Sequence, residues 1–152
     1  MSAGAEDAPV HVMGIPELEA FLEEHFEQAV GFADVVELGE GALTLRLRST
    51  ERHLRPGGTI SGPTIFTLAD LAFYQLTLSL IGPVPLAVTT QLNLSFMRRP
   101  DPGLLEATAT MLKLGRRLAV GRVPHSGDHP ASLYLHGADH RLSEHGGGRA
   151  LI

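Results

Sequence analysis

The sequence predicts an α+β fold in which a curved antiparallel sheet wraps around one long central helix. Three observations support this prediction: an alternating hairpin early in the chain, an apolar helix in the middle, and several alternating segments after it. With 152 residues, the chain suits a single domain with its own core. We therefore expect one domain over residues 1–152, with its core at about 35–142 and flexible tails at both ends.

The first third of the chain predicts a surface helix and a hairpin. Residues 15–30 place apolar side chains at helical spacing behind Pro16, which suits the first turn of a helix. Residues 36–38 and 43–48 alternate apolar with polar side chains around a turn at residues 39–41. These two segments should pair as antiparallel strands.

A long helix should follow the glycine-rich loop at residues 55–62. It can begin at Pro63, because the first helical position needs no N–H, and it should run to about Ile81, before Gly82 and Pro83. Its apolar residues occupy nearly all sides, which is typical of a helix enclosed by other elements. The enclosing strands are expected at residues 86–97, 104–112, 118–123 and 133–142.

Composition excludes several function classes. The chain has no cysteine, so disulfides, thiolate metal ligands and a thiol nucleophile are ruled out. A net charge of −5 and the lack of a basic stripe argue against nucleic acid or an anionic membrane surface as a partner. Polar residues and prolines interrupt the charge-poor stretch too often for a membrane span, and the N-terminus lacks a secretory pattern, so the cytoplasm is the expected location.

Asp70 is the foremost candidate for chemistry. The 42 residues from Pro56 to Met97 carry one formal charge, and that charge is Asp70. A carboxylate in such apolar sequence loses solvation, so it should be either a working group of a site or a hydrogen-bonded structural group.

Two other kinds of site are not expected. Four histidines could suggest a metal, but acidic or thiolate partners do not recur at ligand spacing, and surface histidines are the commoner case. These histidines are His125, His129, His136 and His140. A serine hydrolase is equally unexpected, because the chain has no Gly-x-Ser-x-Gly elbow.

Three ordered segments, at residues 61–70, 87–100 and 113–120, resemble the phenylacetic-acid-degradation (PaaI) branch of hotdog-fold acyl-CoA thioesterases. The resemblance covers about residues 35–142. It implies a hotdog fold and a homodimer or dimer of dimers with acyl-CoA sites at the subunit interface. It implies no cofactor beyond the coenzyme A portion of the substrate.

The resemblance also implies a catalytic helix start. In the family a His-Gly-Gly triplet opens the central helix and an acidic residue stands nine positions after the His, which is the separation of Ser61 and Asp70 here. Asp70 would then be the general base or the nucleophile, and both roles stay open. Gly62 would supply the oxyanion donor through its backbone N–H, while Ser61 and Pro63 replace the family's His and second Gly beside the substrate.

Further substrate contacts follow from the same resemblance. A Ser or Thr that orients water or the thioester in the family aligns with Thr89, although strict alternation also allows Thr90 to face the site. Coenzyme A contacts in the family cluster on the hairpin that matches residues 113–118, where cationic side chains could meet phosphates. The residues implied there are Lys113, Gly115, Arg116 and Arg117.

The activity that the resemblance implies is hydrolysis of acyl-CoA. Gly62 and Asp70 are eight residues apart, roughly 12 Å along a helix, so a site would combine Asp70 of one protomer with Gly62 of another. Because Ser61 and Pro63 depart from the family triplet, a non-catalytic acyl-CoA-binding or regulatory protein is the alternative. A hotdog hydratase is set aside, since Gln75 stands where those enzymes carry a His.

Overall fold

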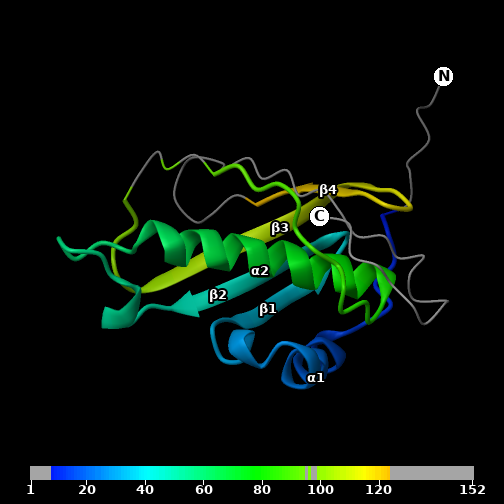
Figure 1. Ribbon diagram of the computed structural model, residues 1–152, viewed down its shortest axis with the longest axis horizontal. Coiled ribbons are helices and arrows are strands. Elements are labelled where there is room, and N and C mark those ends of the chain that lie inside the picture. Colours follow the sequence, from blue (N-terminus) through cyan, green and yellow to red (C-terminus); the bar gives the residue numbers. More distant parts are fainter. Residues whose placement is uncertain (1–7, 95, 97–98, 124–152) are drawn as a thin grey trace.

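The structure is a computed structural model that describes residues 8–94, 96 and 99–123. Within these ranges, four antiparallel strands form one sheet in the order β1-β2-β3-β4, and the long helix α2 lies across one face of it (Figure 1). The elements are β1 (Asp34–Gly39), β2 (Ala42–Arg48), α2 (Gly62–Ile81), β3 (Leu104–Leu114) and β4 (Ala119–Arg122). The predicted fold class, an antiparallel sheet around one central helix, is confirmed.

The hairpin and the central helix form where the sequence predicted them. Strands β1 and β2 join through Glu40 and Gly41, whose φ angles of 49° and 69° give the tight left-handed turn that suits the twist of a hairpin. Helix α2 begins at Gly62, one residue before the expected start. It ends at Gly82, where a φ of 96° stops the helix at little steric cost.

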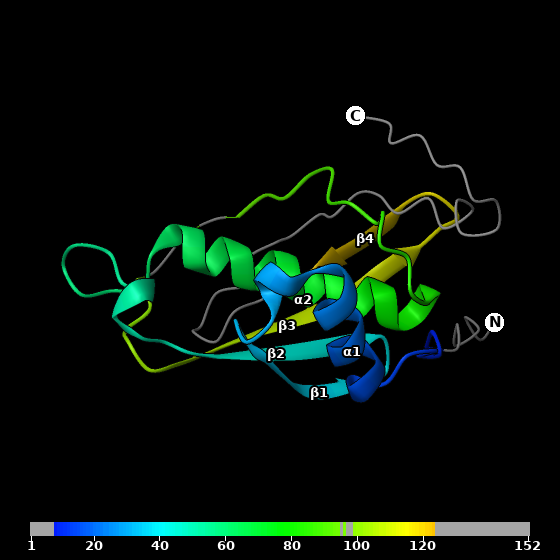
Figure 2. The same cartoon turned by 60° about the horizontal axis from the view of Figure 1, so that its bottom comes forward.

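The N-terminal helix is shorter than predicted. Helix α1 (Ile15–His25) stops before Phe26, whose φ of −146° and ψ of 60° are not helical, and a short 3₁₀ helix, η1 (Glu27–Ala29), follows. A second 3₁₀ helix, η2 (Glu51–His53), lies between β2 and α2. Helix α1 lies beside the C-terminal half of α2 (Figure 2).

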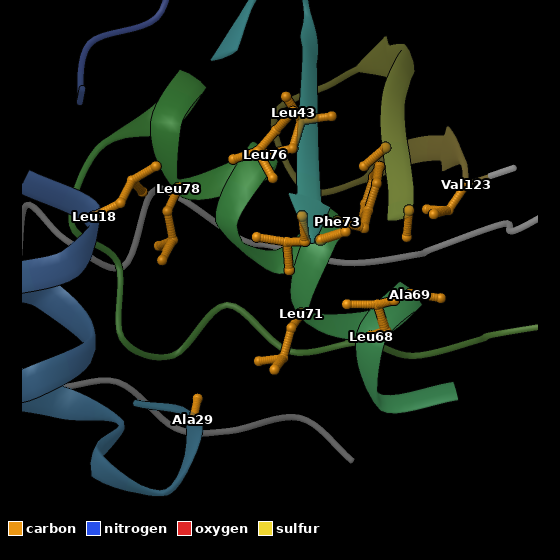
Figure 3. Packing of buried hydrophobic residues seen from close by; sticks show 14 of the residues in the cluster. Leu18, Ala29, Leu43, Leu68, Ala69, Leu71, Phe73, Leu76, Leu78 and Val123 are labelled. Carbon is orange, nitrogen blue, oxygen red and sulfur yellow. The ribbon is translucent and has the colours of Figure 1, made fainter. Parts of the chain in front are cut away.

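The hydrophobic core fills the space between α2 and the sheet (Figure 3). Alternate residues of β2 and β3 point into it, with leucines on β2 and mostly alanines on β3, so that the helix can approach the sheet closely. These residues are Leu43, Leu45, Leu47, Leu105, Ala107 and Ala109. By length and composition α2 could also cross a membrane, but 72% of its apolar window is buried in the fold, as in a core helix.

The strand predicted at residues 86–97 is wrong for the part of that segment that the structure describes. Residues 86–94 pair with no described strand and run back along α2 rather than within the sheet (Figures 1 and 2). Alternating side chains indicate an extended backbone, but a strand also needs a hydrogen-bonding neighbour, which alternation alone does not specify. The strand predicted at residues 133–142 lies outside the described residues.

The segment before α1 is tied to the C-terminal part of α2. The amides of Val12 and Met13 both donate to the carbonyl oxygen of Ser79, at 2.6 and 3.1 Å. His11 Nδ1 lies 2.8 Å from the buried Ser79 Oγ. Burial lowers the pKa of His11, and a backbone hydrogen bond with Gly39 opposes that shift in part.

We expect His11 to make the fold less stable as the solution becomes acidic. The folded chain disfavours the protonated His11 ring. The contribution of His11 to the free energy of unfolding is therefore intact above the unfolded-state pKa of about 6.5 and is lost as the pH falls through the lowered pKa of the folded state. Urea unfolding at about pH 7.5 and about pH 5.5 should therefore show a larger loss for wild type than for His11→Gln. Replacing the exposed His25 by Gln serves as the control, and equal losses in wild type and His11→Gln would contradict the expectation.

Candidate functional site

Asp70 and Thr89 are hydrogen-bonded to each other. Asp70 lies in the third turn of α2, is half-buried, and its Oδ1 accepts a hydrogen bond of 2.6 Å from the Thr89 Oγ1 hydroxyl. The contact forms because residues 86–94 run back along α2. Of the two threonines that the sequence left open, Thr89 is the one whose hydroxyl reaches Asp70. A short bond of this kind holds the carboxylate in one orientation.

Asp70 also lines a cavity of about 280 Å³ between α2 and the segment that precedes β1. Apart from the carboxylate, Gln28 and Thr67 are the polar side chains of the lining, and the Thr67 hydroxyl already donates to the Pro63 carbonyl oxygen at 2.8 Å. The complete lining is Phe26, Gln28, Ala29, Phe32, Phe66, Thr67, Asp70 and Leu71. On this side the carboxylate therefore faces a mainly apolar space that an acyl group can enter.

A larger cavity, of about 600 Å³, adjoins the first one. Gln28, Phe32 and Thr67 line both cavities and so form the wall between them. The larger cavity is lined by Arg48 and Arg52 and reaches the start of α2. The two cavities thus differ in character, one mainly apolar and one cationic.

Among the described residues, the start of α2 leaves one backbone N–H without an acceptor. Ser61 is the N-cap: its hydroxyl accepts from the Thr64 amide at 3.3 Å, and its carbonyl oxygen accepts from the Ile65 amide at 3.2 Å. Pro63 has no N–H to donate. Within the part of the chain that the structure describes, the N–H of Gly62 has no hydrogen-bond acceptor. It lies at the positive end of the helix dipole, where a developing negative charge is stabilised.

The hairpin that carries Lys113, Arg116 and Arg117 lies at the other end of α2. These three side chains are exposed at the connection between β3 and β4, where the Gly115 amide closes the turn with a backbone hydrogen bond of 2.8 Å. Both views place this connection near the C-terminal end of α2, opposite Gly62 (Figures 1 and 2). A single chain therefore does not bring the predicted phosphate contacts to the helix start.

Sequence reasoning did not assign Phe26 and Phe32 to the site. Periodicity predicts Phe26 on the apolar stripe of an N-terminal helix and assigns no role to Phe32, yet both line the cavity beside Asp70. The signal available in the sequence was weak: two phenylalanines in a short, otherwise mixed segment before the first strand.

Metal binding finds no support in the part of the chain that can be described. No three His, Asp or Glu side chains among residues 8–94, 96 and 99–123 come together as a metal ion would require. The four histidines named above all lie beyond residue 123, outside these ranges, so the expectation about them stays a prediction.

Known proteins match both the sequence and the fold. Residues 57–124 match the family model of the thioesterase superfamily. A candidate thioesterase of Silicibacter sp. TM1040 is 40% identical with a TM-score of 0.73, and the match covers 86% of this chain and 96% of that one. A mutant form of the phenylacetic acid degradation protein PaaI from Thermus thermophilus is 26% identical with a TM-score of 0.59, over 77% of this chain and 95% of that one.

A more distant structure shares the fold alone. It is a hypothetical thioesterase protein from Streptococcus pneumoniae, solved with coenzyme A, at 16% identity and a TM-score of 0.63 over 82% of this chain and 97% of that one. No curated protein matches the chain significantly. The family-model match and the 40% identical relative, together with the PaaI neighbour, show that the chain belongs to the thioesterase superfamily, as a hotdog-fold member of the PaaI-like type.

Proposed function

We propose that this protein hydrolyses acyl-CoA thioesters to a free acid and coenzyme A. Membership of the thioesterase superfamily supports thioester hydrolysis in general. The observation that carries the proposal is Asp70, whose carboxylate accepts the Thr89 hydroxyl and faces a mainly apolar cavity. For Asp70 to attack a thioester carbonyl, or to activate water for that attack, its carboxylate must be held beside a space for the acyl group.

Asp70 can act in two ways. As a general base it takes a proton from water while the water oxygen bonds to the carbonyl carbon; the C–S bond then breaks, and the thiolate leaves with its electron pair. As a nucleophile its own oxygen bonds to the carbonyl carbon, which expels the thiolate and gives a mixed anhydride that water cleaves. In both routes the carbonyl oxygen becomes negative and needs a hydrogen-bond donor.

We assign that donor to the Gly62 N–H of a second copy of the chain. Gly62 and Asp70 share one helix and are separated by about 12 Å along its axis, too far to act on one carbonyl group. Exposed apolar side chains near both residues support a partner surface there: Phe66, Val88 and Phe96 are 43%, 55% and 54% exposed. A homodimer or a dimer of dimers would complete the site.

The coenzyme A portion of the substrate is assigned to cationic side chains. The Streptococcus protein that shares this fold was solved with coenzyme A, which supports a ligand of that type. The proposed phosphate contacts are Lys113, Arg116 and Arg117. In one chain their hairpin lies far from Gly62, so it would come from a different copy than the one that supplies Gly62. We place the activity in the cytoplasm, with no bound cofactor and with neither nucleic acid nor membrane as a partner.

Release of free thiol from a panel of short, long and aryl acyl-CoA esters tests the proposal. We expect saturable turnover of at least one class. Tight binding without turnover across the panel would favour the alternative, a non-catalytic acyl-CoA-binding or regulatory protein. That alternative is suggested by Ser61 and Pro63, which differ from the His and the second Gly of the family triplet. If the panel shows neither binding nor turnover, both proposed functions are ruled out.

A further inference from the structure

The cavity beside Asp70 has an aromatic wall assembled from two distant parts of the chain. Phe66 comes from α2, whereas Phe26 and Phe32 flank η1 in the segment before β1. The family-model match covers residues 57–124, so Phe66 lies inside it, and Phe26 and Phe32 lie outside it. The part of the wall that lies outside the family-model match is therefore residues 26–32.

The rings of Phe26 and Phe32 are each held by an edge-to-face contact. Phe26 packs on Tyr74 of α2 at 5.9 Å and 87°, and Phe32 packs on His53 of η2 at 5.8 Å and 90°. Backbone hydrogen bonds fix the turn between the two rings, since the Ala29 amide donates to the Phe26 carbonyl oxygen at 3.0 Å and the Phe32 amide to the Ala29 carbonyl oxygen at 3.3 Å. Contacts within the chain thus hold both rings in place.

We propose that Phe26 and Phe32 select the acyl group, and that they favour compact apolar acyl groups over long straight chains; this rests on the proposed hydrolysis of acyl-CoA. The cavity of about 280 Å³ is about twice the volume of the roughly 150 Å³ apolar cavity that takes a benzene molecule. A long fatty acyl chain exceeds that space. An acyl group with a second carboxylate is disfavoured as well, because the carboxylate of Asp70 lines the same cavity.

Phe32 has the larger role, because it separates two spaces. Phe32 lines both the 280 Å³ cavity and the adjoining cavity of about 600 Å³. Truncation to Ala opens the part of the partition that Phe32 forms beside Gln28 and Thr67, so that a long chain can pass out of the smaller cavity toward the adjoining one. Phe26 lines only the smaller cavity, so its truncation enlarges that cavity without joining it to the other.

The test compares kcat/KM for octanoyl-CoA and palmitoyl-CoA in wild type, Phe26→Ala, Phe32→Ala and Phe32→Leu. We expect the palmitoyl to octanoyl ratio to rise by about tenfold or more in Phe32→Ala, to rise less in Phe26→Ala, and to return toward wild type in Phe32→Leu. Val36→Ala is the matched control: Val36 is an exposed apolar residue of β1 that lines neither cavity, and the ratio should not change. An unchanged ratio in Phe32→Ala, or an equal loss for both substrates, would overturn the proposal.

Binding measurements keep this test separate from the test of hydrolysis. Octyl-CoA and hexadecyl-CoA thioethers cannot be hydrolysed, and calorimetry gives the affinity of each variant for both. If wild type hydrolyses no thioester, the proposed function fails, but a shift of the affinity ratio toward hexadecyl-CoA in Phe32→Ala still supports the selecting wall. An unshifted affinity ratio would contradict the proposed selection by Phe26 and Phe32, whether or not the protein is an enzyme.

Discussion

Replacing Asp70 by Asn should lower kcat for acyl-CoA hydrolysis by about a hundredfold to ten-thousandfold. Asn has nearly the same shape as Asp, and its Oδ1 can still accept the Thr89 hydroxyl that binds Asp70 in wild type. The amide can neither take a proton from water nor attack a carbonyl group, so the chemical step is lost while the fold is kept. Steady-state kinetics with the best substrate of the acyl-CoA panel measures the effect.

Asp34→Asn is the matched control for this prediction. Asp34 is exposed at the start of β1 and does not line the cavity beside Asp70, so the same change of charge there should leave kcat near the wild-type value. Circular dichroism and size-exclusion chromatography should give the same fold and assembly for both variants. If Asp70→Asn turns over acyl-CoA at the wild-type rate, Asp70 has no part in the chemistry.

Replacing Gly121 by Ala should destabilise the fold by about 1–3 kcal/mol. Gly121 is buried in β4, and a Cβ atom there would overlap the ring of Phe73 and lie 2.8 Å from the carbonyl oxygen of Thr110. The Phe73 ring is itself buried, with 4% of its surface exposed, so it cannot move aside without displacing the core. We expect the melting temperature to fall by roughly 2–4 °C for each kcal/mol lost.

Gly39→Ala tests whether this cost comes from the overlap or from the loss of a glycine. Gly39 lies in β1, adopts no left-handed backbone conformation, and a Cβ atom there would meet nothing within 4 Å. Its replacement should be neutral or slightly stabilising, because alanine loses less conformational freedom on folding. Equal urea midpoints for the two variants would show that Phe73 yields more readily than its burial implies.

The features that could be predicted from the sequence are those with a local cause. Helix α2 was predictable because Pro63 and Gly82 bound a run of apolar residues, and the hairpin because alternation is interrupted by a glycine turn. Asp70 could be singled out since one charge in 42 residues is conspicuous without any structure. That Thr89 donates a hydrogen bond to Asp70 was not predicted; its expected role toward water or the thioester stays a prediction.

The features that could not be predicted depend on which distant segments meet. The alternation of residues 86–94 is real, but their path along α2 depends on a hydrogen-bonding neighbour that the pattern does not identify. The wall formed by Phe26 and Phe32 depends on a turn of non-helical backbone at Phe26. Helical periodicity carries no information about such a turn.

Under the proposed mechanism, the Ser61-Gly62-Pro63 sequence at the start of α2 differs from the family triplet in two side chains and still offers the backbone donor. The donor proposed for the carbonyl oxygen is the backbone N–H of Gly62, so it does not depend on the side chains at positions 61 and 63. Among the described residues, the serine cap binds the Thr64 amide and Pro63 has no N–H, so the proposed polarisation relies on the Gly62 hydrogen. Under the proposed mechanism, the main-chain conformation of this turn therefore matters more for carbonyl polarisation than the identity of the side chains at positions 61 and 63.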